Sequence, residues 1–461
     1  MTATLPRLAL GALAAAALAA CSSVTDTLLE VTDPDIVDPV AASSPDGAVG
    51  LRNGALARFR TATTSTESSW LFGGLLADEW STSSTFVQND ETDQRAILEN
   101  NSSVTTQFRN LNRARTAANL AIKGLREFRP NPASDLAEMY FVRGFAEMQL
   151  AQDFCNGIPL TDASEPEIRF AAPQPVEAVS RVAVASFDTA IALANGTDAA
   201  SVNVNRAARI ARARALLGVN QPAEAATTVA GIPTTYSYDH TYSLVTGDNI
   251  LWSQPASQMR YTVGDSVEGN ARNLRVQNAI PFHSARDPRV PSSYTVGTRN
   301  DTSRAQDGLT YIRRTSLWQR TTPVAVANGI DARLVEAEAR LRAGDAPGML
   351  AILNALRAAP PRLGEVQPAT MPALVDPGTP ERRVDLLFRE KAFWTFGRGQ
   401  RLGDLRRLIR QYGRTQEQVF PTGVHYKGGV YGTDVNLPVP NDERNNPQVG
   451  PDKPACIDRR A

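Results

Sequence analysis

Apolar residues recur at helical spacing through much of the chain. In 107–127, Phe108, Leu111, Ala118, Ile122 and Leu125 lie three, seven, four and three residues apart, which places them on one face of a helix. A similar stripe runs from residue 139 to residue 150 and stops at the Cys-Asn-Gly-Ile-Pro sequence of 155–159. Helical structure is therefore expected from about residue 46 onward.

Two stretches read as helical hairpins. In 206–230, Ile210 and Leu217 precede a turn at 218–222 and a second, alanine-rich helix. In 331–358, Leu334 and Leu341 precede a turn at Gly344 and a further apolar stripe. Small residues allow paired helices to approach closely, which is typical of tetratricopeptide-like units. The repeat period is not regular, so the pattern predicts helical pairs and not a uniform array.

The remaining stretches differ in character. Residues 231–322 are rich in Thr, Ser, Tyr, Asn and Gly and lose helical periodicity, which favours long loops that shape a ligand surface. A proline-rich gap at 359–380 leads to one more long helical stretch at 381–411, and 420–461 reads as turns. We therefore expect a mostly α-helical single domain over 46–461, with its irregular ligand-side segment at about 231–322.

The N-terminus reads as an export signal. Arg7 precedes an apolar run from Leu8 to Ala17, and residues 18–21 are Leu-Ala-Ala-Cys. This ending resembles the lipobox of bacterial lipoproteins, in which the cysteine is lipidated and becomes the new N-terminus. An ordinary signal peptide with a chance cysteine is the alternative. We expect a signal peptide at 1–20, a lipid on Cys21 and a polar tether at 21–45.

The charge balance excludes one class of partner. Lys plus Arg and Asp plus Glu both number 48, so the formal net charge is zero and no basic face points to nucleic acid. After the leader, no apolar stretch approaches the length of a membrane-spanning helix. The expected attachment to a membrane is through the lipid anchor only.

Cysteine usage predicts one disulfide. With Cys21 lipidated, Cys155 and Cys456 remain, and an exported protein lies in an oxidising compartment. We expect these two cysteines to form a bridge that fastens the proline-rich C-terminus to a loop at a helix end. Two separate buried thiols are the alternative.

The sequence lacks the common catalytic and metal-binding motifs. His240, His283 and His425 are scattered, and there is neither a Gly-x-Ser-x-Gly elbow nor a phosphate-binding loop. Asp33 and Asp35, with a further aspartate at 38, alternate as in some calcium sites, but the neighbouring prolines favour a solvated tether. We expect no metal and no cofactor. Two carboxylates suffice for a glycosidase, so missing motifs do not exclude one.

A C-terminal motif carries a family resemblance. Residues 389–407 read Arg-Glu-Lys-Ala-Phe-Trp-Thr-Phe-Gly-Arg-Gly-Gln-Arg-Leu-Gly-Asp-Leu-Arg-Arg, which resembles the signature of the SusD/RagB-like nutrient-binding lipoproteins. The Leu-Pro-Val-Pro of 437–440, the helical pair of 329–357 and the earlier helices match the family in the same order. The matching signature positions are Glu390, Gly399, Arg401, Asp404, Leu405 and Arg407.

This motif differs from the family pattern at two positions, and its charged residues have two possible interpretations. Lys391 stands where the family usually has arginine, and Arg398 where it commonly has glutamate. We interpret Glu390, Arg401 and Asp404 as structural charges that pair across a helix break near Gly399. An acid/base pair of Asp404 with Glu390 is the alternative.

The resemblance implies capture of an oligomeric nutrient, often a glycan, and delivery to a SusC-like TonB-dependent transporter at the outer membrane, on the cell exterior. Sugar recognition uses aromatic faces and planar polar groups. We expect Trp80 and Trp318 to form the ligand surface, with Trp70 and Asn89 as further candidates.

The function predicted from the sequence is therefore binding of an oligosaccharide or a peptide without catalysis. Two other readings stay open. One is a helical-repeat lipoprotein that serves as a scaffold for assembly of other envelope proteins, and the other is a tethered hydrolase.

Overall fold

The structure is a computed structural model that describes residues 43–268, 274–295, 304–450 and 455–461. The expected signal peptide, the lipidated Cys21 and nearly all of the 21–45 tether, including its three aspartates, lie outside the described residues. Among the described helices, none combines the length and the apolar character needed to cross a bilayer.

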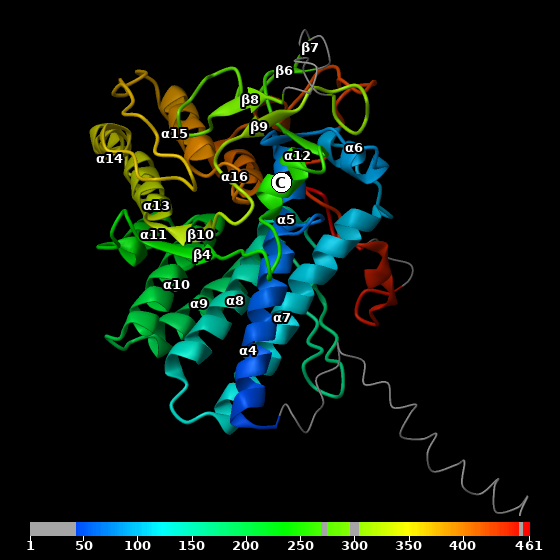
Figure 1. The fold of residues 1–461 in the computed structure, drawn as a ribbon, viewed down its shortest axis with the longest axis vertical. Coiled ribbons are helices and arrows are strands. Elements are labelled where there is room, and N and C mark those ends of the chain that lie inside the picture. The colour runs from blue at the N-terminus through cyan, green and yellow to red at the C-terminus, as the bar shows by residue number, and fades with distance from the viewer. Residues whose placement is uncertain (1–42, 269–273, 296–303, 451–454) are drawn as a thin grey trace, which may run out of the picture.

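Helices make up most of the secondary structure (Figure 1). In chain order they are α4 (Pro45–Thr64), α5 (Ser69–Ala77), α6 (Val87–Asp93), α7 (Ser102–Phe128), α8 (Ala133–Asp153), α9 (Val176–Leu193), α10 (Ala199–Gly218), α11 (Pro222–Val229), α12 (Ile250–Ala256), α13 (Gly329–Arg342), α14 (Ala346–Ala358), α15 (Pro380–Trp394), α16 (Arg401–Tyr412), α17 (Gln416–Val419) and the 3-10 helix η1 (Asn441–Asn445).

The strands are short and pair two by two, each pair antiparallel. The pairs are β1 (Trp80–Thr82) with β5 (Tyr261–Val263), β2 (Ile158–Pro159) with β3 (Pro173–Gln174), β4 (Ser237–His240) with β10 (Val324–Asn328), β6 (Val267–Glu268) with β7 (Leu274–Arg275), and β8 (Ser292–Tyr294) with β9 (Arg313–Thr315).

The long helices stand side by side as antiparallel neighbours. Helix α4 packs on α7, α7 on α8, α8 on α9 and α9 on α10, and the α10–α11 hairpin continues into α13 and α14 (Figure 1). Strands β6, β7, β8 and β9 lie with α12, α15 and α16 toward the other end of the molecule, and β4 and β10 lie between the two parts (Figure 1). The predicted fold class, mostly α with tetratricopeptide-like pairs and a long irregular segment, is confirmed.

Helix boundaries follow from local chemistry. The predicted stripe of α7 is buried, and Asn101 caps this helix by accepting a hydrogen bond from the Val104 amide at 3.1 Å. Helix α13 begins at a capping box in which Asn328 and Asp331 each accept from the other's backbone amide at 3.0 Å. These caps satisfy amide groups that the first helical turn leaves unpaired.

The helical stretch at 381–411 contains the break that was expected near Gly399. It consists of two helices, because residues 395–400 form a turn in which Gly397 and Gly399 have φ values of 69° and 65°. Only glycine adopts this conformation at little cost. Helix α9 was not singled out beforehand, although its buried positions follow a helical stripe.

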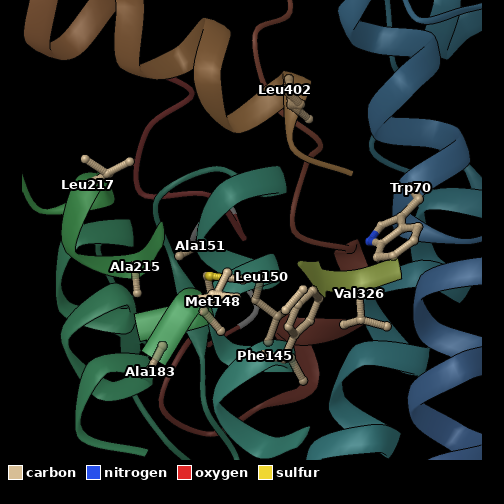
Figure 2. Close-up of a cluster of buried hydrophobic side chains, with 14 of the residues drawn as sticks. Trp70, Phe145, Met148, Leu150, Ala151, Ala183, Ala215, Leu217, Val326 and Leu402 are labelled. Carbon is tan, nitrogen blue, oxygen red and sulfur yellow. The ribbon is translucent and has the colours of Figure 1, made fainter. Parts of the chain in front are cut away.

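The core is continuous across the helical pairs and the strand pair β4–β10. Phe145 and Met148 of α8, Ala215 of α10, Val326 of β10 and Leu402 of α16 converge on one cluster (Figure 2). Helices α8 and α10 contribute small residues here, which lets neighbouring elements approach closely. The irregular segment is thereby held on a rigid helical base.

The predicted disulfide between Cys155 and Cys456 is present in the structure. It joins the loop after α8 to the C-terminal segment, where the Leu437 amide also donates to the Asp153 carbonyl at 2.8 Å. The bridge therefore fixes the tail against the end of a core helix.

We expect the double variant Cys155→Ala/Cys456→Ala to lower the free energy of unfolding by about 2–5 kcal/mol, because the bridge closes a loop across 301 residues of sequence. Urea unfolding checks this. The reduced wild type should match the variant, and unchanged unfolding of both would contradict a stabilising bridge.

Candidate ligand-binding site

A cavity of about 480 Å³ lies where four segments distant in sequence meet. They are residues 234–239 around β4, the stretch 317–330 that runs through β10 to the start of α13, the loop 361–365 after α14, and residues 393–398 at the end of α15. Arg289 lines the cavity beside them. The volume is within the range of small-molecule sites.

Backbone contacts between the segments hold the cavity open. Strands β4 and β10 pair, and the Glu365 amide donates to the Leu317 carbonyl at 2.9 Å. The Thr322 hydroxyl donates to the Glu365 carboxylate at 2.5 Å. These contacts fix the 361–365 loop over the 317–322 stretch, so the walls are set by structure that needs no ligand.

The floor of the cavity is aromatic. The ring of Trp318 is stacked on Phe396, with 6.3 Å between centroids and 18° between planes. The ring of Trp80 lies beside that of Trp318, with 6.5 Å between centroids and 38° between planes. Phe393 and Trp394 complete the floor. The indole Nε1 of Trp394 is buried and has no hydrogen-bond partner among the described residues.

The rim of the cavity is polar and exposed. The exposed lining residues with polar side chains are Thr235, Ser237, Asp239, Arg362 and Glu365. They offer hydroxyl, carboxylate and guanidinium groups beside the aromatic floor. The arrangement suits a ligand with apolar ring faces and many hydroxyl groups, since both kinds of surface are within one cavity.

The buried charged side chains beside the cavity form ion pairs. Arg289 donates to Glu390 at 2.6 Å and to Asp287 at 2.7 Å. Arg398 donates to both carboxylate oxygens of Asp331, at 3.1 and 2.7 Å. Burial alone would raise the pKa of Asp331, but Arg398 holds it below its ordinary value. These ion pairs therefore build the walls and leave no free buried charge in them.

The charged signature residues form ion pairs within the structure, as expected from the sequence. Most of their partners, however, are residues outside the signature. Glu390 accepts from Arg289 and also from Arg357 at 2.8 Å. Arg401 pairs with Asp78 at 3.0 Å. Asp404 does pair across the helix break, with Lys391 at 2.8 Å. The expectation that all three charges bridge the break is corrected for Glu390 and Arg401, whose partners lie in other segments.

Gly399 is required by packing. A Cβ atom there would lie 2.0 Å from Cδ1 of Trp70, and one at Gly397 would lie 2.8 Å from the ring of Trp318. Contacts shorter than 3.0 Å are essentially unknown for real Cβ atoms. The turn therefore needs glycine both for its backbone conformation and for the aromatic rings that press on it.

Among the predicted ligand residues, Trp318 lines the cavity, with 5 % of its surface exposed. Trp70 and Trp80 are 0 % exposed and lie in the core, where Figure 2 shows Trp70 among apolar side chains. Asn89 is 3 % exposed and does not line the cavity. These three side chains therefore present no face to a ligand in this structure, because the helices and the irregular segment close over them.

Several lining residues were missed by the sequence analysis. Asp239 lies in β4, Arg289 in the irregular segment, and Arg362 and Glu365 in the loop after α14, none of them within a motif. The general expectation that residues 231–322 shape a ligand surface pointed toward Asp239 and Arg289, and nothing in the sequence pointed toward Arg362 and Glu365. Their proximity depends on the pairing of β4 with β10 and on the packing of the 361–365 loop.

No group of three or more His, Cys, Asp or Glu side chains in the described ranges is arranged to hold a metal ion. The predicted absence of a metal and of a cofactor therefore remains a prediction for the chain as a whole.

Comparison with known proteins identifies the fold. No protein-family model and no curated protein matches the chain. Solved structures do match it. A SusD-like carbohydrate-binding protein from Bacteroides fragilis is 14% identical with a TM-score of 0.61, and the match covers 88% of this chain and 99% of that one. This is the SusD-like fold.

Two further structures agree. A SusD superfamily protein from Parabacteroides distasonis is 14% identical, with a TM-score of 0.60 over 87% of this chain and 98% of that one. A laminarin-binding SusD-like protein is 15% identical, with a TM-score of 0.53 over 82% and 96% of the two chains. The SusD/RagB-like resemblance of the sequence is confirmed at the level of the fold.

A buried carboxyl beneath the cavity floor predicts a pH dependence. Glu79 is buried, and its Oε1 accepts from the Gly397 amide at 2.8 Å while Oε2 has no partner among the described residues. Burial raises the pKa of Glu79 from 4.5 to about 8, outweighing the amide, which lowers it.

Because the folded-state pKa of Glu79 is raised, its contribution to stability is full below pH 4.5 and is lost as pH rises through about 8. The variant Glu79→Gln stays neutral. We expect its free energy of unfolding, relative to wild type, to rise by a few kcal/mol (on the order of 1.4 per pKa unit) across this range.

Urea unfolding at a series of pH values measures that difference. The exposed Glu177→Gln should show no comparable rise, since Glu177 lies on the surface of α9. A flat difference for Glu79→Gln between pH 4.5 and 9 would contradict a raised pKa.

Proposed function

We propose that this chain is a SusD/RagB-like lipoprotein of the outer membrane that captures an oligomeric nutrient, a glycan first of all, and hands it to a TonB-dependent transporter. The observation that carries the proposal is an aromatic-floored cavity with a polar rim in a SusD-like fold, a fold shared with a carbohydrate-binding protein and a laminarin-binding one. Its action is binding and release without bond cleavage.

The chemistry of the cavity favours a glycan over a strongly charged ligand. A sugar ring presents C–H groups to an aromatic face and hydroxyls to planar polar groups. Trp318 supplies the face, and Asp239, Arg362 and Glu365 supply the groups. The rim carries both signs of charge, so it suits neutral hydroxyls better than a polyanion.

The shape of the cavity also limits the length of the glycan that it can bind. The cavity is walled by four segments and has an exposed rim on which Thr235 and Ser237 lie. A walled cavity takes a chain end or a short oligosaccharide, whereas a long polymer needs an open groove. Capture of pre-cut fragments fits the role of a protein that passes its ligand to a transporter.

Export and anchoring rest on the N-terminal sequence. The apolar leader and the Leu-Ala-Ala-Cys ending at Cys21 support lipidation of this cysteine. A lipid anchor would keep the binding domain beside a transporter in the same membrane. Delivery then requires only local transfer, because tethering raises the effective concentration of the two proteins.

We expect Trp318→Ala to weaken glycan binding at least about tenfold, because it removes the aromatic platform. We expect Arg362→Ala, which changes an exposed side chain, to weaken binding about three- to tenfold by removing a hydrogen-bond donor. Calorimetric titration with laminarin oligosaccharides and a panel of other neutral glycans measures both.

Matched controls separate binding from folding. Trp252→Ala changes a partly buried tryptophan outside the cavity, and Arg181→Ala removes an exposed arginine that, like Arg362, pairs with a nearby glutamate. Both should bind like wild type. Absence of binding to every glycan, or equal binding by all four variants, would contradict the proposed site.

We expect the lipidated protein, purified gently from native envelopes, to bring along a TonB-dependent barrel in stoichiometric amount, and Cys21→Ser to lose it through release from the membrane. Mass spectrometry of the purified material identifies the partners. A preparation dominated by assembly factors would favour the scaffold function, and release of cleaved products from a glycan would favour a tethered hydrolase.

A further inference from the structure

A second, smaller cavity of about 30 Å³ lies where helices α8, α10, α13 and α16 meet. Its apolar side is formed by Met148, Ala151, Ala215 and Leu217, which lie together in Figure 2. A space of this size holds about one or two water molecules or a single small ion. It is separate from the large cavity and shares no lining residue with it.

The polar side of this cavity is rich in positive charge. Its charged lining residues are four basic side chains and two acidic ones, namely Arg214, Lys391, Arg407, Arg410, Asp331 and Asp404. Both acidic groups already have partners. Asp331 accepts from Arg398 at 2.7 Å and from Gln400 at 3.0 Å, and Asp404 accepts from Lys391 at 2.8 Å and from Arg407 at 2.9 Å.

Arg214 is a buried basic residue of this cavity without a directly paired anion among the described residues. Its side chain comes from α10 and is 5 % exposed. The Nη2 atom donates to Gln152 at 3.3 Å, Nη1 has no hydrogen-bond partner, and no carboxylate lies within 4.0 Å of the guanidinium in the described part of the chain. Arg410, at the exposed end of the same cavity, also lacks an ion pair within the described ranges.

Three acids interact electrostatically with Arg214 without pairing with it, Asp331 most strongly, then Asp404 and Asp153. Asp331 and Asp404 are each held by two other donors, and burial raises the pKa of Asp153 to about 8, so its carboxyl is mainly protonated at neutral pH. A buried guanidinium without a directly paired anion is unfavourable, and proteins relieve it by pairing. An anion beside Arg214 would supply both the missing charge and the missing acceptor for Nη1.

We propose that this cavity binds one small monovalent inorganic anion of halide size, such as chloride, held chiefly by Arg214 and sited among Lys391, Arg407 and Arg410. The anion lies between the α10–α11 hairpin and the signature helices α15 and α16, and it stabilises their packing. The proposal does not rest on glycan binding, because the two cavities are built from different residues.

Thermal unfolding of the full-length lipidated protein tests the proposal, with chloride replaced stepwise by gluconate at constant sodium concentration. Gluconate is too large for the cavity. We expect the unfolding midpoint to rise with chloride concentration and to gain a constant increment for each tenfold increase above the dissociation constant. Bromide should replace chloride. Equal midpoints in chloride and gluconate would overturn the proposal.

Two variants on the same helix make the test specific. Arg214→Met replaces the guanidinium with an apolar chain of similar length and should abolish the chloride dependence. Arg206→Met, which changes an arginine of α10 outside the cavity, should keep it. Loss of the dependence in both variants, or in neither, would overturn the role of Arg214.

A crystal grown in bromide gives a readout that does not depend on the variants folding. An anomalous peak in the cavity within hydrogen-bonding distance of Arg214 Nη1 would support the anion. Ordered water at that place without anomalous signal would mean that water alone fills the cavity, and the proposal would then be wrong.

Discussion

The buried ion-pair network around the α15–α16 turn is the constraint on which the rest of the structure depends. Glu338 of α13 accepts from Lys391 at 2.8 Å and from Arg407 at 2.5 Å, and Arg401 reaches Asp78 beside α5. Removing one partner of such a pair leaves an uncompensated buried charge, which costs about 3–5 kcal/mol. The network therefore admits one arrangement of the N-terminal helices, the α13–α14 hairpin and the signature helices.

The large cavity is a consequence of this arrangement. Its floor is the turn between the two signature helices, where Phe396 meets Trp318, and its walls are loops placed by β4 and β10. The glycines of the turn allow the aromatic rings to approach the backbone. A rigid floor with loop-built walls is a scaffold on which ligand preference can change without disturbing the core.

Similarity at 14% identity to SusD-like proteins shows how little of the sequence the fold requires. Many different residues of the same chemical type can form a helical stripe, a helix cap or a close helix contact. A buried charge, in contrast, needs a particular partner of opposite charge. Lys391, where the family usually has arginine, still pairs with Glu338 and Asp404. A single ammonium with three donors can make both contacts, although without the paired donors of a guanidinium.

The sequence by itself determined the helical pairs and the irregular segment, and it favoured the pairing of Cys155 with Cys456 over two separate thiols, because periodicity, turn residues and cysteine number are local or countable properties. It also indicated that Glu390, Arg401 and Asp404 are structural charges. Only the tertiary structure determined which residues these charges pair with. It also placed Trp70 and Trp80 in the core, and it brought Trp318, Arg362 and Asp239 together in one cavity. Residue type shows that a tryptophan can stack on a sugar, but exposure depends on what the chain packs against it, and those contacts come from segments far apart in sequence.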